Sequence, residues 1–112
     1  MEQKLEVDIK EARELARNGS GVVVFSENPY DISFIQEVLC TKNVGFMNMD
    51  DARRLIMELD EPKTLENLSR KYGNLIVVCP HGRTSLRFVN ALAKFKVTAY
   101  SLKRGISGLR YS

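Results

Sequence analysis

The run LIVVC, Leu75 to Cys79, is apolar at every position and contains three β-branched side chains. A strand without a polar face has to be covered on both sides, as the inner strands of parallel sheets in α/β proteins are. The run VVVF, Val22 to Phe25, has the same character. These two runs predict a buried sheet that needs helices on both of its faces.

Segments with helical periodicity alternate with apolar runs along the rest of the chain. Helices are predicted after Asp8, Asp31, Asp50 and Thr64 and from Ser85 to Phe95, and further strands at Val44 to Met49 and Val97 to Leu102. Asp8 and Glu11 have the spacing of a capping box, which marks the start of the first helix. The alternation predicts one α/β domain over residues 1–112, with a mostly parallel central sheet flanked by helices.

The charge distribution and the lack of long apolar runs limit the partners of the chain. The net charge is +3, and no acidic residue follows Glu66. The basic C-terminal part could attract a small anion, but it has no aromatic-rich basic stripe, so nucleic acid is not favoured as a partner. No apolar run approaches the ~20 residues that cross a bilayer, and no secretion signal opens the chain. We therefore expect no membrane partner and a cytoplasmic location.

The chain has two cysteines, Cys40 and Cys79, and one histidine, His81. Their spacing matches no zinc motif, so no metal site is expected, and a structural disulfide is not expected in a reducing cytosol. Cys40 ends an apolar helix face and is predicted to be a buried packing residue. A resolving role, in which Cys40 forms a disulfide with Cys79, stays open if the two lie close together.

Cys79 ends the strongest predicted strand, and ligands of α/β sheets bind at the carboxyl ends of strands. Gly82 lets the following turn take a positive φ, and the next helix begins near Thr84 or Ser85 with its free N–H groups directed back at the sulfur. Helix N-termini and nearby cations favour a reactive thiolate. A buried packing cysteine beside a common strand-to-helix turn is the alternative.

The sequence thus predicts an exposed, ionised nucleophile at Cys79. The anion-binding loop around it is expected to comprise Pro80, His81, Gly82, Arg83, Thr84 and Ser85, with electrostatic support from Arg87. His81 is interpreted mainly as a loop residue, because it lies only two residues from Cys79, and a contact with substrate is its second interpretation.

The segment IVVCPHGRTSLRFVNAL, followed by VTAYSLKRGISGLR, resembles the C-terminal half of a rhodanese-like domain of the single-domain sulfurtransferase type. The matching residues are Cys79, Gly82 and Ser85 in the loop, and Gly105, Ile106 and Leu109 in a later glycine motif. The resemblance covers residues 75–110. It implies a rhodanese-like fold with Cys79 as the catalytic residue.

The resemblance also implies a reaction. Cys79 would attack the outer sulfur of an anionic donor such as thiosulfate and become a persulfide. A small thiol or a protein acceptor would then take the sulfur. No metal or organic cofactor is needed, because the cysteine itself carries the group between the two half-reactions.

Two other functions stay open. The N-terminal half lacks the D-V-R and H-I-P-G-A segments that are usual in the family, which leaves a non-catalytic interaction module on the same fold. A cysteine-dependent phosphatase is less favoured. Such an enzyme needs an arginine six residues after the cysteine to clamp the phosphoryl group, and that position is Ser85.

Overall fold

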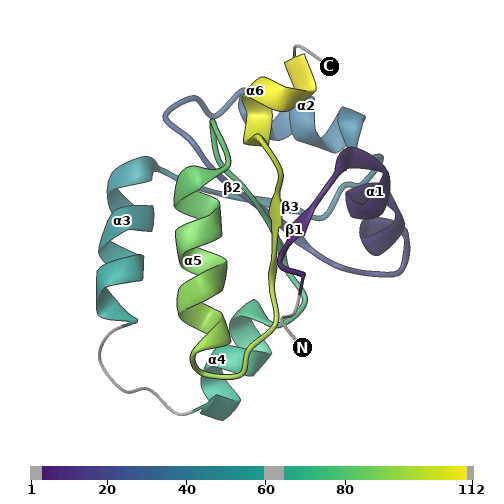
Figure 1. Ribbon diagram of the computed structural model, residues 1–112. Coiled ribbons are helices and arrows are strands. Elements are labelled where there is room, and N and C mark those ends of the chain that lie inside the picture. The colour runs from purple at the N-terminus through teal and green to yellow at the C-terminus, as the bar shows by residue number, and fades with distance from the viewer. Residues whose placement is uncertain (1–3, 60–64, 111–112) are drawn as a thin grey trace.

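In the computed structural model, five strands pair in parallel to form one sheet with the order β1-β5-β4-β2-β3 (Figure 1). The strands are β1 (Glu6–Val7), β2 (Val22–Phe25), β3 (Val44–Met47), β4 (Ile76–Val78) and β5 (Tyr100–Leu102). The structure describes residues 4–59 and 65–110. The predicted α/β fold with a central parallel sheet is confirmed, and every strand pair within the described part is parallel.

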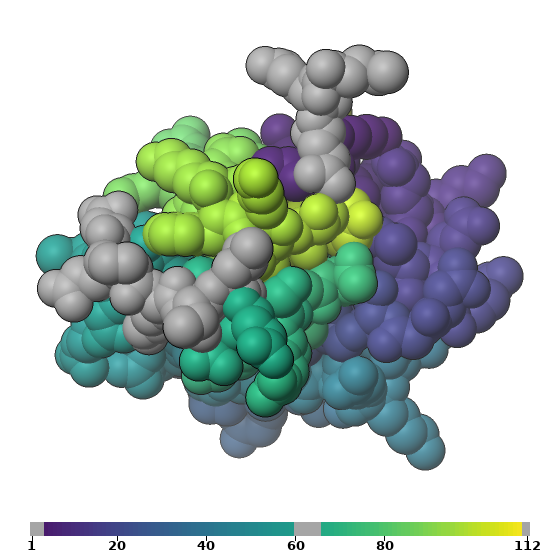
Figure 2. All heavy atoms as spheres, turned by 90° about the horizontal axis from the view of Figure 1, so that it is seen from below, coloured from purple at the N-terminus to yellow at the C-terminus, as the bar shows by residue number. Residues whose placement is uncertain are grey.

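Helices cover both faces of this sheet. They are α1 (Ile9–Arg17), α2 (Asp31–Val38), α3 (Met49–Glu58), α4 (Leu65–Tyr72), α5 (Arg83–Ala93) and α6 (Gly105–Arg110). α3, α4 and α5 pack on one face, and α1, α2 and α6 pack on the other (Figure 1). α4 and the turn after α5 lie at the end of the molecule opposite α6 (Figure 1), and this end faces the viewer when the molecule is seen from below (Figure 2). No helix within the described ranges has the length and apolar character needed to span a bilayer.

The central strand β4 explains why both faces need a cover. Val77 packs with the core on the α5 side, whereas Ile76 and Val78 pack with the core on the α1 side. All three side chains are completely buried. Successive side chains of a strand point to opposite faces, so an entirely apolar strand contributes to two cores at once.

Two elements were not predicted from the sequence. β1 has two residues and is defined by its pairing with β5, where Glu6 lies opposite Ser101. α6 contains two glycines in six residues and has no helical periodicity. In addition, α5 begins at Arg83 rather than at Ser85, and the predicted cap at Thr64 lies outside the described residues. The two additional elements and the earlier start of α5 depend on tertiary contacts or on turn geometry rather than on local sequence pattern.

The predicted capping box at the start of α1 is confirmed. Asp8 accepts a hydrogen bond from the backbone N–H of Glu11 at 2.8 Å, and the Glu11 carboxylate accepts one from the N–H of Asp8 at 3.3 Å. We expect Asp8→Ala to lower the free energy of unfolding by about 1 kcal/mol, because an N-terminal N–H of α1 loses its partner. Chemical denaturation measures this loss. Glu14→Ala, at an exposed site in the same helix, is the control, and equal stabilities of both variants would contradict the prediction.

Candidate active site

Cys79 lies directly after β4, at the carboxyl edge of the sheet. β4 is flanked by β5 and β2. The chain leaves β2 toward β3 on one side and leaves β4 toward β5 on the other, so the loops after β2 and β4 diverge. Ligands of open α/β sheets bind in the crevice that such a divergence creates. The cysteine is therefore placed where the topology of the sheet favours a binding site.

The loop after β4 holds the Cys79 sulfur with backbone amides. The N–H groups of Gly82 and Ser85 donate to Sγ at 3.1 and 3.3 Å. Gly82 has a φ of +80°, which turns the chain so that its N–H points inward, and α5 starts at the next residue. Amide dipoles that converge on one atom stabilise negative charge there. The loop thus presents two convergent N–H groups to the sulfur.

Two buried hydroxyl groups extend this arrangement. The Cys79 thiol donates to Ser85 Oγ at 3.2 Å, and Ser85 Oγ lies 2.7 Å from Ser101 Oγ. Ser85 was predicted as a loop residue, but Ser101 was missed. The signal that could have found Ser101 is a hydroxyl group in VTAYSL, a predicted strand.

α6 supports the loop from the other side. The N–H of Ile106 donates to the carbonyl of Cys79 at 3.0 Å, and the N–H of Ser107 donates to that of Pro80 at 2.9 Å. Gly105 has a φ of +58°, and a Cβ atom there would lie 1.9 Å from the Cys79 carbonyl oxygen. The later glycine motif thus lies against the Cys79 loop, at a distance that no other residue type allows.

The prediction of an exposed cysteine is wrong. Cys79 is only 1% exposed, and it packs with the core that includes Phe25 and Phe88. It continues the side-chain alternation of β4 on the α5 side, where the loop and the first turn of α5 lie against it. The sulfur is therefore closed off from solvent in this structure.

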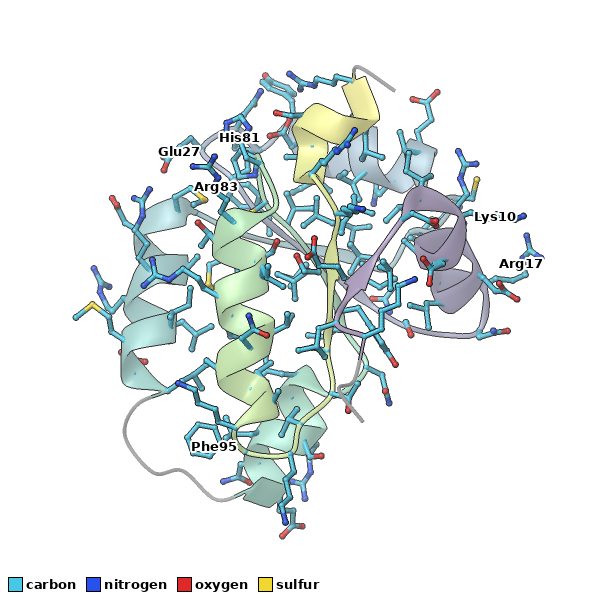
Figure 3. All side chains as sticks on the ribbon, viewed as in Figure 1. Lys10, Arg17, Glu27, His81, Arg83 and Phe95 are labelled. Carbon is cyan, nitrogen blue, oxygen red and sulfur yellow. The ribbon has the colours of Figure 1, made fainter. Side chains whose placement is uncertain are left out.

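The remaining predicted loop residues lie around the sulfur without contacting it. His81 is exposed and its Nδ1 lies 2.9 Å from Ser107 Oγ. Arg83 is exposed at the start of α5, and Thr84 is half-buried. Figure 3 shows His81 and Arg83 at the end of the molecule where α6 lies. Arg83 thus adds positive charge near the loop.

Arg87 does not belong to this loop. It lies one turn further along α5 and lines a separate hollow of about 310 Å³ together with Ile56 and Met57 of α3. In the described part of the chain, no hydrogen bond or ion pair joins Arg87 to the loop, so the predicted electrostatic support is not matched by a direct contact.

A cavity of about 230 Å³, which no sequence motif indicates, adjoins the loop. Its lining comes from three places in the chain: Asp31, Pro80, His81, Ile106, Ser107 and Arg110. Asp31 is buried, accepts a hydrogen bond from Ser26 and pairs with Arg110 at 3.1 Å. Asp31 and Arg110 are 79 positions apart, so only the fold brings them together.

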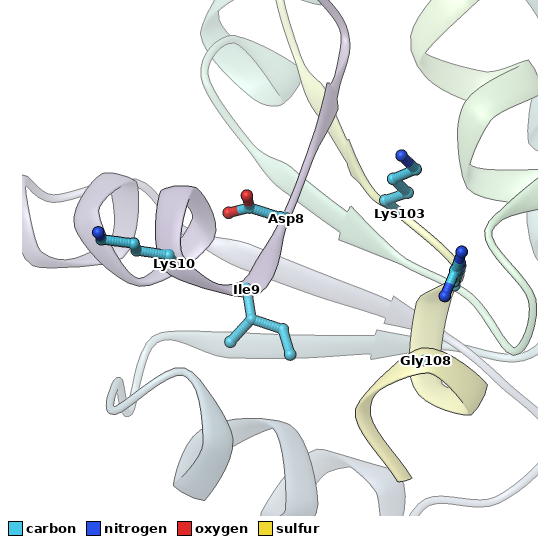
Figure 4. Close-up of a pocket in the computed structure, with 6 residues that line it drawn as sticks. Asp8, Ile9, Lys10, Lys103 and Gly108 are labelled. Carbon is cyan, nitrogen blue, oxygen red and sulfur yellow. The ribbon is translucent and has the colours of Figure 1, made fainter. Parts of the chain in front are cut away.

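A second hollow, of about 360 Å³, lies between the start of α1 and the β5–α6 turn (Figure 4). Its lining residues are Asp8, Ile9, Lys10, Lys103, Arg104 and Gly108. The Cys79 sulfur does not line it. Arg104 has a φ of +65° and its backbone approaches Gly82, so this turn is also tightly packed against the loop.

The prediction of a buried Cys40 is wrong as well. Cys40 is exposed, has a φ of +54° and follows the end of α2. α2 runs from the carboxyl end of β2 back to the amino end of β3. Cys40 therefore lies near the amino ends of the strands, whereas Cys79 lies at their carboxyl ends. A disulfide needs Cα atoms within about 7 Å of each other. Cys40 therefore does not serve as a resolving partner of Cys79 within this fold.

The sequence matches no protein-family model, and neither a curated protein nor a solved structure shows significant similarity to it. The resemblance of residues 75–110 to rhodanese-like domains thus stays a prediction from the sequence. The function has to be argued from the chemistry of the Cys79 loop.

Proposed function

We propose that the protein is a sulfurtransferase or persulfide carrier in which Cys79 is the nucleophile. The observation that carries this proposal is the placement of Sγ. It lies at the carboxyl end of a central parallel strand and accepts N–H groups from Gly82 and Ser85 at 3.1 and 3.3 Å. A cysteine that only fills space does not require two amide donors. A thiolate and a persulfide anion do, because each carries a full negative charge.

The reaction has two balanced half-steps. In the first, the Cys79 thiolate attacks the outer sulfur of thiosulfate, an S–S bond forms to Cys79, and the S–S bond of the donor breaks to release sulfite. The product is a persulfide anion on Cys79. In the second, a thiolate of a small molecule or a protein attacks the outer sulfur, and the Cys79 thiolate leaves. The cysteine ends as it began, so no cofactor is consumed.

The electrostatics around the loop support an anionic donor. Arg83 and Arg104 lie beside the loop, and no acidic residue occurs after Glu66. Asp31, the acidic residue that lines the adjoining cavity, is paired with Arg110. A divalent anion therefore approaches a region in which positive charge prevails.

The burial of Cys79 favours a second function. With the residue 1% exposed, a non-catalytic interaction module with a packed cysteine is consistent with the closed loop. A phosphatase gains no support, since Ser85 contacts the sulfur where a phosphoryl-clamping arginine would be needed. The two remaining functions differ in whether sulfur becomes bound to Cys79.

Intact mass after incubation with thiosulfate tests the proposal. We expect the wild-type protein to gain one sulfur atom, to lose it on treatment with a reducing thiol, and to carry it on the peptide that contains Cys79. Cys40→Ser is expected to gain sulfur to the same extent, because Cys40 lies at the opposite edge of the sheet. Absence of any sulfur gain in a folded protein, with thiosulfate and with an organic persulfide as donors, would favour the interaction module.

A further inference from the structure

A chain of two buried hydroxyl groups ends on the Cys79 sulfur. It runs from Sγ to Ser85 Oγ at 3.2 Å and from there to Ser101 Oγ at 2.7 Å. Ser85 and Ser101 are both 0% exposed. Ser85 lies in the first turn of α5, and Ser101 lies on β5 opposite Val77, so the chain crosses from the helix to the neighbouring strand beneath it.

Packing alone does not explain these two serines. Their surroundings are apolar, and a buried hydroxyl group is unfavourable unless it is hydrogen-bonded. Within the described residues, the side chain of Ser101 bonds to Ser85 and to no other side chain. Alanine at both positions would fill the space and would leave no buried polar group that needs a hydrogen bond. Within the described residues, the hydroxyl pair is hydrogen-bonded to one further side chain, the Cys79 thiol. We therefore look for its role in the chemistry of that thiol.

The hydrogen atoms of the chain fit the thiolate better than the thiol. When Cys79 is a thiol, the thiol and the two hydroxyl groups carry three hydrogen atoms in total. The chain contains two hydrogen bonds, one between Sγ and Ser85 and one between Ser85 and Ser101, so one hydrogen atom takes part in neither. When the thiol proton leaves to a solvent base, Ser101 donates to Ser85 and Ser85 donates to the sulfur anion. Every hydroxyl hydrogen then has an acceptor, and each bond polarises the next.

We propose that Ser101 is a positioning residue that acts through Ser85 to stabilise the Cys79 thiolate. This inference rests on the proposed role of Cys79 as the nucleophile. The role of Ser101 is to fix the Ser85 hydroxyl as a donor to sulfur, which complements the two amide donors of the loop. Ser101 itself does not touch a substrate.

The charged groups near Cys79 are the same in every variant needed for the test. On the loop and α5 they are His81 and Arg83; on the β5–α6 segment they are Arg104 and Arg110; after β2 they are Glu27 and Asp31 (Figure 3). Because His81 bonds to Ser107 and not to either serine of the chain, its contribution cancels when serine variants are compared.

The experiment follows the ultraviolet absorbance of the thiolate against pH, in a Cys40→Ser background. We expect Ser85→Ala to reduce the ratio of thiolate to thiol about tenfold at a given pH, and Ser101→Ala about threefold. In the double variant, removal of the Ser101 hydroxyl is expected to add nothing to the effect of Ser85→Ala. Ser26→Ala removes a buried hydroxyl group that bonds to Asp31 and not to the Cys79–Ser85–Ser101 chain, so as a control it should change the profile less than Ser101→Ala does.

Two results would overturn the inference. One is a wild-type profile in Ser101→Ala, and the other is an undiminished Ser101→Ala effect in the Ser85→Ala background. Circular dichroism of each variant verifies that it is folded. Failure of the proposed function is distinguishable, because it appears as absent sulfur uptake by the wild type, whereas this test measures ionisation without any sulfur donor.

Discussion

Cys79→Ser is expected to abolish sulfur uptake from thiosulfate completely. Serine keeps the shape of the side chain and can accept the N–H groups of Gly82 and Ser85, but a hydroxyl group is not appreciably ionised at neutral pH and does not form a stable bond to sulfane sulfur. Intact mass spectrometry of the wild type and the variant, after identical incubations, measures the difference. The fold should persist, since the substitution nearly conserves volume and hydrogen bonding.

Two controls accompany this prediction. Thermal unfolding of Cys79→Ser separates a chemical loss from a loss of structure, and Cys40→Ser shows whether any cysteine suffices. Sulfur bound to Cys79→Ser would move the carrier role to Cys40, which is exposed and lies at the other edge of the sheet. That outcome would contradict the proposed site.

Gly105→Ala is expected to lower the free energy of unfolding by about 3 kcal/mol and to disrupt the Cys79 loop. A Cβ atom at this position would lie 1.9 Å from the Cys79 carbonyl oxygen and 2.8 Å from the Gly82 nitrogen. Both are backbone atoms, which cannot rotate away as a side chain can. The positive φ of +58° adds strain for any L side chain. Relief of the clash requires α6 to separate from the loop, which loosens the amide donors around the sulfur.

Gly19→Ala is the matched control for backbone strain. Gly19 also has a positive φ, +103°, but a Cβ atom there would meet nothing within 4 Å. We expect it to cost about 1–2 kcal/mol from conformation alone and to leave sulfur uptake intact. Denaturant unfolding of both variants measures the difference. Equal losses would show that the contact between Gly105 and the Cys79 carbonyl contributes nothing to stability.

Several features of the site were open to prediction because each is encoded locally. The apolar run before Cys79 predicts a strand with two covered faces, and β4 contributes to both cores. Gly82 and the start of α5 predict amide donors directed at the sulfur, and two such donors contact it. The spacing of Asp8 and Glu11 predicts a capping box, which forms. The amide donors and the capping box join groups within six residues of one another, and the alternation of β4 is a property of one short strand.

The sequence by itself determined the alternation of strands and helices, the parallel sheet and the position of Cys79 at its carboxyl edge, because hydrophobic periodicity, turn residues and caps act over short distances. Only the tertiary structure decided the exposure of the two cysteines. Cys79 is buried because its side chain packs with Phe88 and with Phe25, which lies far from it in the sequence, and Cys40 is exposed although it follows the buried Leu39. The tertiary structure also decided that Ser101 contacts Ser85, because the pairing of β5 with β4 in the sheet brings β5 beside α5.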